Sequence, residues 1–181
     1  GKSFSMKEAI TFIALFTDDD IIIIDPEREY GELIRALHGT VLEVSPNSPN
    51  HFNPLAIDKG YGAGENPIAM KYELMMSICE QQMGAGQLGA FHKSIIDRCT
   101  ANIYRDLIKS GGKARQPTLP DWRNDVKRQP EREAQELALA SELFVEGSLN
   151  MFAHETNIDI TNRMICFDLY EMGEQLKPTA M

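Results

Sequence analysis

The chain has 181 residues, of which 43% are hydrophobic, and it carries a formal net charge of −9. A chain of this length and composition can bury one sizeable core and a smaller second one. The negative charge argues against nucleic-acid binding by a broad basic face, although it leaves open a narrow basic pore built by several subunits. No apolar run reaches membrane-spanning length, so we expect no transmembrane segment in this chain.

The first three residues, Gly1, Lys2 and Ser3, match the second half of a phosphate-binding P-loop, G-x-x-x-x-G-K-[ST]. In such a loop glycine lets backbone N–H groups approach the phosphates, lysine contacts the β- and γ-phosphates, and the serine hydroxyl binds Mg²⁺. Gly1, Lys2 and Ser3 are therefore the candidate ATP-binding residues, with Ser3 the candidate Mg²⁺ ligand. The triplet alone is a weak signal because it often occurs by chance. Since the first half of the loop is missing, we expect the chain to be a fragment cut inside it.

The next segments alternate between helical and strand patterns. Apolar residues at helical spacing predict a helix over residues 2–16, and the isoleucine run 21–24 predicts a central strand covered on both faces. A second helix is expected around residues 29–37, with Gly39 as its stop signal, followed by a strand at 40–44. This alternation is typical of an α/β fold with a parallel sheet.

The middle of the chain changes to helical patterns. Proline and asparagine between residues 45 and 55 predict an irregular surface loop, and the glycines of 60–64 predict a connector rather than a second phosphate loop. Helical spacing then extends over segments within 70–144, before the apolar run 163–169 returns to a strand pattern. We therefore expect a helical subdomain inserted into one sheet. The expected domains are a core at 1–64, a helical subdomain at 65–146, and a return to the core at 147–181.

Two features of the helical part have alternative interpretations. The basic stretch 109–128 contains Trp122, which would stack on a base in a nucleic-acid site or pack as an anchor under a solvated surface; the second is favoured because acidic residues are interleaved. Cys79, Cys99 and Cys166 lie far apart without metal-ligand spacing. They are expected to be reduced core or boundary residues of a cytosolic protein.

Two strand-ending carboxylates compete for a catalytic role, Asp25 after residues 21–24 and Asp168 after 165–167. In P-loop enzymes such an aspartate orients Mg²⁺ or its water, while a nearby glutamate polarises the attacking water. Acids also terminate strands and cap the next helix, and we favour this for Asp168. Asp25 and Glu29 are the catalytic candidates, because they follow the strand after the P-loop helix, where open α/β sheets bind ligands.

Three motifs together resemble the ATPase domain of the VirB4/TraE family of type IV secretion and conjugation ATPases, within the HerA- and FtsK-like class. They are Gly1-Lys2-Ser3, the Asp-Pro-x-x-Glu pattern within residues 21–30, and Phe52-Asn53-Pro54-Leu55. Residues 147–152 and 163–169 are also similar to the family's stretch ahead of its Walker B strand. The resemblance implies a partial P-loop NTPase fold of the RecA/FtsK type with an inserted helical subdomain, truncated before Walker B.

The resemblance also implies a function. It implies Mg²⁺-dependent ATP hydrolysis that powers assembly, or transfer of DNA or protein, in a secretion machine. The full-length protein would be a hexameric ring, cytoplasmic and peripheral at the inner face of the cell membrane, with secretion-channel components and DNA as candidate partners. By position, Lys2 would hold phosphate, Ser3 would hold Mg²⁺, and Glu29 with Asp25 would organise the water or a neighbouring subunit's contact. The fragment alone is expected to be inactive.

Other functions stay open. One is a HerA/FtsK-like DNA translocase, and another is a non-catalytic interaction module whose helical subdomain docks partners. A small-molecule kinase is weaker, because it needs a substrate lid and arginines near the phosphates, and Arg28 and Arg35 are the only early candidates.

Overall fold

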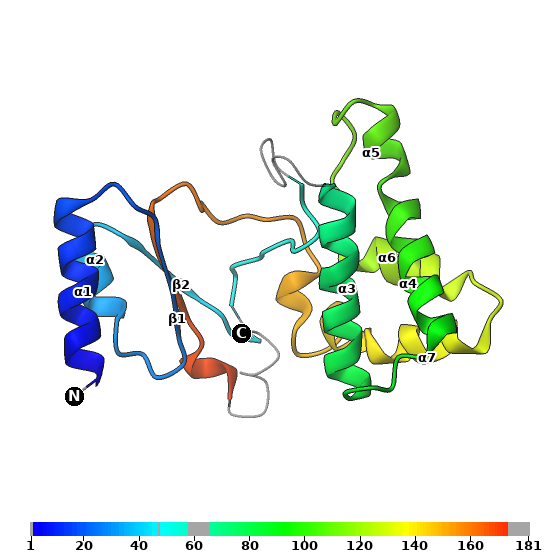
Figure 1. The fold of residues 1–181 in the computed structure, drawn as a ribbon, viewed down its shortest axis with the longest axis horizontal. Helices are drawn as coiled ribbons and strands as arrows, with labels where there is room; N and C mark the ends of the chain where they lie inside the picture. Colours follow the sequence, from blue (N-terminus) through cyan, green and yellow to red (C-terminus); the bar gives the residue numbers. More distant parts are fainter. Residues whose placement is uncertain (1, 47, 58–65, 174–181) are drawn as a thin grey trace. The chain divides into compact units, whose positions relative to one another are not determined.

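The structure, a computed structural model, describes residues 2–46, 48–57 and 66–173, except for the side chain of Lys2 (Figure 1). The chain divides into two compact units, one of residues 1–50 with 157–181 and one of residues 51–156. We call them the sheet unit and the helical unit and describe each by itself. The functional domains expected from the sequence, with boundaries after residues 64 and 146, stay a prediction.

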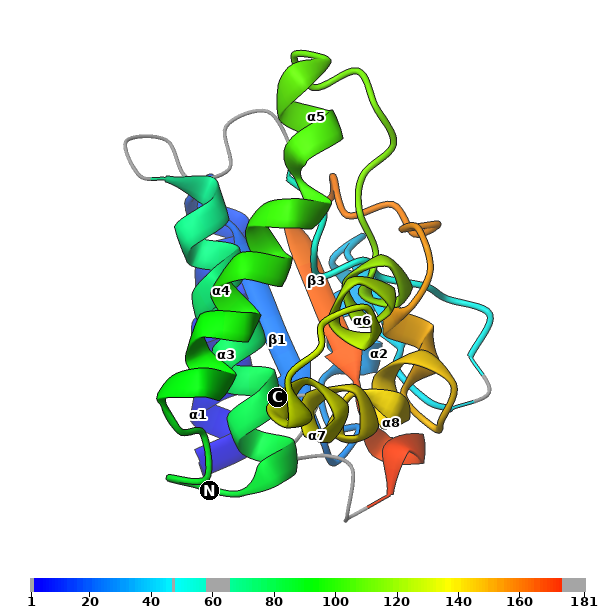
Figure 2. The ribbon, with the colours of Figure 1, turned by 90° about the vertical axis from the view of Figure 1, so that its right-hand side faces the viewer.

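The sheet unit combines a small parallel sheet with two helices. Its elements in chain order are α1 (Lys2–Phe16), β1 (Ile21–Asp25), α2 (Gly31–Ala36), β2 (Thr40–Glu43), β3 (Met164–Asp168) and the short 3-10 helix η2 (Tyr170–Met172). The described sheet has the strand order β1-β3-β2, and β1 and β2 both run parallel to β3. Figure 2 shows β1 and β3 side by side. The two chain segments of this unit therefore meet at β3, which lies between strands that are more than a hundred residues away in the sequence.

The core of the sheet unit lies where α1 and α2 cover one face of the sheet. Ile10 of α1 and Ile34 of α2 pack with Ile21, Met164 and Cys166 in one buried cluster. Removing this apolar surface from water is the main driving force that holds the helices on the strands. The predicted mixed helix and strand architecture is confirmed at this level.

The predicted cover on both faces of the isoleucine strand is wrong for the described residues. Ile21 is buried, whereas Ile22 and Ile24 are 70% and 46% exposed. Side chains alternate along a strand, so Ile22 and Ile24 point to the face opposite the helix-covered one. β1 is also an edge strand of the described sheet rather than a central one.

The end of α2 depends on a close approach, which the stop-signal prediction for Gly39 did not include. The left-handed residue after the helix is His38, with φ 63°, and not the glycine. A Cβ atom on Gly39 would lie 2.6 Å from Cγ2 of Ile34 and 2.9 Å from Cβ of Met164. Glycine is therefore required here because the chain passes too close to α2 and β3 for any side chain.

The described residues of the helical unit form helices in each segment where the sequence patterns predicted them. Its elements are α3 (Pro67–Met83), α4 (Ala90–Ile103), α5 (Arg105–Lys109), α6 (Leu119–Lys127), α7 (Arg132–Ala140), α8 (Glu142–Val145) and the 3-10 helix η1 (Asn150–Phe152). The start of α3 has a local cause: the Asn66 side chain accepts the N–H of Ile68 at 3.0 Å, and Pro67 occupies the first turn. Within the described ranges, no helix is long and apolar enough to cross a membrane.

Trp122 is a core residue of the helical unit. Its side chain is fully buried, and its indole N–H donates to Oγ1 of Thr100 at 3.2 Å, which joins α6 to α4. The packed-anchor interpretation is thus confirmed, because a fully buried ring cannot stack on a base. The three cysteines are also buried and free of disulfides, as expected.

The Asn-Pro-Leu loop was predicted to run over the surface, and this is wrong for its central residues. Asn53 is 4% exposed and Leu55 is fully buried. The Asn53 amide donates to the carbonyl of Pro117 at 2.9 Å, and the Tyr104 hydroxyl donates to the carbonyl of Leu55 at 2.6 Å. Buried backbone groups need partners, and here the side chains of the helical unit supply them.

Candidate functional site

The strand ends of the sheet unit bring acidic side chains into one row. Asp25 at the end of β1 and Glu43 at the end of β2 both pair in register with Asp168 of β3. Helix α1 runs opposite to β1, so its N-terminal end lies at the same end of the sheet (Figure 1). Open α/β sheets bind ligands at the carboxyl ends of their strands, and this end is therefore the candidate site.

Asp25 holds the turn that follows β1. It is 1% exposed. Its two carboxylate oxygens accept the backbone N–H groups of Glu29 at 3.0 Å and Tyr30 at 2.9 Å. Its carbonyl accepts the N–H of Leu169 at 3.0 Å. Asp25 therefore connects β1 to the start of α2 and to the segment after β3.

Cys166 lies beneath this carboxylate. Its Sγ atom is 3.9 Å from Oδ2 of Asp25. Burial and then the charge of Asp25 raise the pKa of Cys166 to about 12. The group remains a neutral thiol at physiological pH and packs as a small apolar side chain.

Glu29, the second candidate catalytic residue, is exposed to solvent. Its side chain is exposed and forms neither a hydrogen bond nor an ion pair with any residue that the structure describes. It lines a hollow of about 370 Å³ together with Arg28, Arg35, Glu43 and Asp168. The structure thus brings Asp25 and Glu29 together through the backbone and leaves the Glu29 carboxylate accessible.

Asp168 has two partners of its own. One carboxylate oxygen accepts Nε of Arg28 at 2.6 Å, and the other accepts the N–H of Tyr170 at 3.0 Å. Both carboxylate oxygens thus have partners within the chain, as expected of an acid that ends a strand and binds the turn that follows. The hydrogen bond from Arg28 to Asp168 also raises the pKa of Arg28.

Arg28 is the site residue that sequence reasoning missed as a structural partner. Its second contact is to Glu171, with 3.2 Å between Nη1 and Oε1, and its guanidinium lies 4.9 Å from the ring centroid of Tyr170. The partners are 140 residues or more away in the sequence, so no local pattern could reveal them. The only local signal was an arginine inside the Asp-Pro-x-x-Glu pattern.

The P-loop candidates are only partly described. Gly1 lies outside the described residues, as does the side chain of Lys2. Ser3 is half-buried in the first turn of α1, which is 15 residues long and has no acidic residue in that turn. A helix N-terminus that has a hydroxyl and no acidic residue in its first turn fits a phosphate group and its Mg²⁺.

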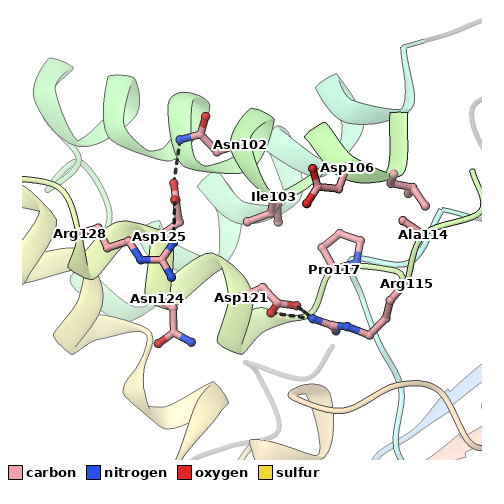
Figure 3. Close-up of a pocket in the computed structure, with 11 residues that line it drawn as sticks. Asn102, Ile103, Asp106, Ala114, Arg115, Pro117, Asp121, Asn124, Asp125 and Arg128 are labelled. Atoms are coloured by element: carbon pink, nitrogen blue, oxygen red, sulfur yellow. Dashed lines mark hydrogen bonds and ion pairs between the residues drawn. The ribbon is translucent and has the colours of Figure 1, made fainter. Parts of the chain in front are cut away.

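A second hollow, of about 340 Å³, lies in the helical unit (Figure 3). Its charged groups are largely paired with one another: Arg115 contacts both oxygens of Asp121 at 2.8 Å, and the Asn102 amide donates to Asp125 at 2.9 Å. Asp121 also accepts the N–H of Thr118 at 2.8 Å, so this network sets the start of α6. These contacts explain the hollow as a structural feature.

Comparisons with known proteins place the fold. No protein-family model matches the chain, and no curated protein matches it. Among solved structures, the chain is similar to VirB4 of Thermoanaerobacter pseudethanolicus, with a TM-score of 0.73 and 21% identity. The match covers 94% of this chain and 47% of that one, so the chain spans about half the length of the VirB4 chain. The chain has a VirB4-like fold, which confirms the resemblance expected from the sequence at the level of the fold.

Proposed function

We propose that this chain is part of an ATP-hydrolysing motor of a type IV secretion or conjugation system, as in the VirB4/TraE family. The VirB4-like fold supports the proposal, since it extends over 94% of the chain. The observation that carries it is the turn after β1, where buried Asp25 holds the backbone and leaves Glu29 exposed at the carboxyl end of the sheet. This is where a P-loop enzyme needs a carboxylate.

The proposed ligand is ATP bound with Mg²⁺, and ATP supplies the phosphoanhydride bond that is cleaved. We assign its binding to the backbone of Gly1, the ammonium of Lys2 and the hydroxyl of Ser3, which would ligate Mg²⁺. The dipole of α1 adds a positive potential at the phosphate position. None of these groups has to change its protonation state.

We assign different roles to the two candidate catalytic residues. Asp25 acts through the backbone, because both its oxygens already accept N–H groups and its side chain is buried. Glu29 is the group that orients the attacking water and accepts its proton, since its carboxylate is accessible. A carboxylate in this role stabilises the transition state more than bound ATP.

The wider setting follows the family resemblance. It includes a hexameric ring of the full-length protein, a cytoplasmic position peripheral to the inner face of the membrane, secretion-channel partners, and DNA or protein as cargo. The core domain would comprise residues 1–64 and 147–181, and the helical subdomain residues 65–146.

The test is steady-state ATP hydrolysis by the full-length protein with Glu29→Gln. We expect turnover to fall at least about tenfold, about 1.4 kcal/mol of barrier, with ATP affinity kept. Glu8→Gln on α1 is the control for removing one exposed carboxylate, and its turnover should match the wild type. Normal hydrolysis by Glu29→Gln would move the water-activating role elsewhere. No hydrolysis by the wild type would favour an interaction module.

A further inference from the structure

The turn that presents Glu29 contains a backbone conformation that its residue type does not explain. Arg28 has φ 57°, in the left-handed region. L-residues rarely adopt this region, and glycine takes it freely. The contacts of the arginine side chain must therefore stabilise the fold by more than the left-handed backbone costs. Strained residues of this kind cluster at functional sites.

The side chain of Arg28 joins the turn to the segment after β3. Its Nε atom donates to Oδ2 of Asp168 at 2.6 Å, and Asp168 is only 4% exposed. Its Nη1 atom contacts Glu171 at 3.2 Å, and its guanidinium faces the Tyr170 ring at 4.9 Å. Three neighbouring residues of one segment thus hold a single guanidinium, and the contact with the buried Asp168 is the closest and best shielded.

Asp25 and Arg28 hold the turn from two directions. Asp25 fixes the backbone N–H groups of Glu29 and Tyr30 from within β1. Arg28, next to Glu29 in the sequence, anchors the same turn to β3. The backbone that carries the exposed Glu29 side chain is therefore held at two points. Asp25 binds the N–H of Glu29, and the side chain of the preceding residue, Arg28, binds Asp168.

We propose that Arg28 is a positioning residue, which holds Glu29 at the end of the sheet by pairing with Asp168. This inference rests on the proposed function, in which Glu29 orients the attacking water. Arg28 itself does not contact the reacting atoms. Its guanidinium is already engaged by Asp168, Glu171 and Tyr170, so its effect reaches the reaction only through the position of Glu29.

The test compares Arg28→Gln with the conservative Arg28→Lys in the full-length protein, with Arg132→Gln as a control. Arg132 is an exposed arginine that pairs with Glu136 of its own helix, α7, so its loss changes the net charge equally and removes an ion pair within a single helix. Two quantities are measured: amide hydrogen exchange of Glu29 and Tyr30, and the kcat and KM of ATP hydrolysis. Exchange reports the opening of the turn without any need for catalysis.

We expect exchange of both amides to become at least about tenfold faster in Arg28→Gln, while the amides of β1 keep their protection. kcat should fall at least about fivefold with KM changed less than about twofold, because the loss concerns the transition state rather than ATP binding. Arg28→Lys should restore part of both quantities, and Arg132→Gln should match the wild type.

Unchanged exchange in Arg28→Gln would overturn the proposal, since the turn would then be held without Arg28. Faster exchange with normal kcat would overturn it as well, because the position of Glu29 would not matter for turnover. Absence of hydrolysis in the wild type would instead refute the proposed function and with it the catalytic consequence. The exchange rates would still decide whether Arg28 holds the turn.

Discussion

The carboxylate of Asp25 accepts the backbone N–H of Glu29 at 3.0 Å, so the buried acid and the exposed acid of the Asp-Pro-x-x-Glu pattern are linked through the main chain. The four-residue spacing has a geometric reason. It lets the chain turn back over the end of β1 and place its N–H groups against the acid that ends the strand. One acid organises the turn, and the other is presented by it.

Asp25→Asn tests this link. The amide keeps one acceptor oxygen, but its NH₂ group would face the second backbone N–H and leave that donor unpaired. We expect the free energy of unfolding to fall by about 1–3 kcal/mol, the cost of one buried unsatisfied group. Denaturant unfolding measures it. Asp18→Asn, at an exposed position between α1 and β1, should change stability by less than about 0.5 kcal/mol. Equal stability of the two variants would contradict the role of Asp25.

Gly39→Ala tests the close approach behind α2. The new Cβ would lie 2.6 Å from Cγ2 of Ile34 and 2.9 Å from the carbonyl oxygen of Met164. Relief requires the backbone of β3 or α2 to shift, so we expect a loss of about 1–3 kcal/mol in thermal or denaturant unfolding.

The matched control for that change is Gly31→Ala at the start of the same helix. There the nearest atom to a new Cβ is 3.5 Å away, which is an ordinary contact. Alanine is also the better helix former, so this variant should be neutral or slightly more stable. A Gly39→Ala protein as stable as Gly31→Ala would show that the two segments separate easily.

Local sequence patterns predict many of the helices and strands. The features that they do not predict depend on contacts between residues far apart in the sequence. The apolar runs near residues 21, 40 and 164 predicted the strands, and periodicity predicted most helices, because burial imposes its period on the sequence. Helix α6 was missed although Thr118 and Asp121 form a capping pair around Pro120, a start signal that the surrounding charges obscured.

The candidate site shows the same division. The motif indicated Asp25 and Glu29 as candidates, since strand, turn and acid lie within ten residues of sequence. The contact of Arg28 with Asp168 joins positions 140 residues apart, and the burial of Asn53 depends on the carbonyl of Pro117. Proline and asparagine favour loops wherever they occur, and only tertiary structure decides whether a loop is exposed or embedded.

Low pH should weaken the hydrogen bonds that Asp121 forms at the start of α6. Burial opposes ionisation of Asp121, but hydrogen bonds from Arg115 and Thr118 outweigh it and hold the pKa of Asp121 below its ordinary value of 3.8. A carboxyl group whose pKa is lower in the native state than in the unfolded state stabilises the fold at every pH above the unfolded-state pKa. For Asp121 this stabilisation is lost as the pH falls through 3.8 towards the native pKa.

The measurement is unfolding free energy against pH for the wild type and Asp121→Asn. The difference between them should shrink as the pH is lowered from about 6 to about 3. Asp106→Asn is the control, since this exposed carboxylate lines the same hollow without a side-chain partner among the described residues. A difference that stays constant with pH would show that Asp121 contributes through its shape alone.

Trp122 offers a direct optical check of the helical unit, because the chain has one tryptophan. Its ring is fully buried and its N–H is bonded to Thr100. We expect blue-shifted emission, weak quenching by acrylamide, and no change on adding single-stranded DNA, since a base needs an open ring face to stack. Strong quenching by DNA at unchanged stability would revive the nucleic-acid interpretation of residues 109–128.

The last prediction separates ATP binding from hydrolysis at the P-loop. In the proposed function the Lys2 ammonium contacts phosphate in bound ATP as well as in the transition state. Lys2→Ala in the full-length protein should therefore weaken Mg-ATP binding itself, by at least about tenfold in Kd, or about 1.4 kcal/mol. Glu29→Gln should leave Kd unchanged and lower turnover, because its carboxylate acts as charge develops on the attacking water.

Calorimetric titration of both variants with Mg-ATP measures this contrast, and Lys7→Ala provides a control. Lys7 lies in the second turn of the same helix, and its loss removes an equal charge without touching the P-loop motif. If Lys2→Ala and Lys7→Ala bound ATP equally well, the triplet at the start of α1 would be only a helix beginning. A Lys2→Ala protein that lost affinity, beside a Glu29→Gln protein that lost only turnover, would assign binding to Lys2 and water activation to Glu29.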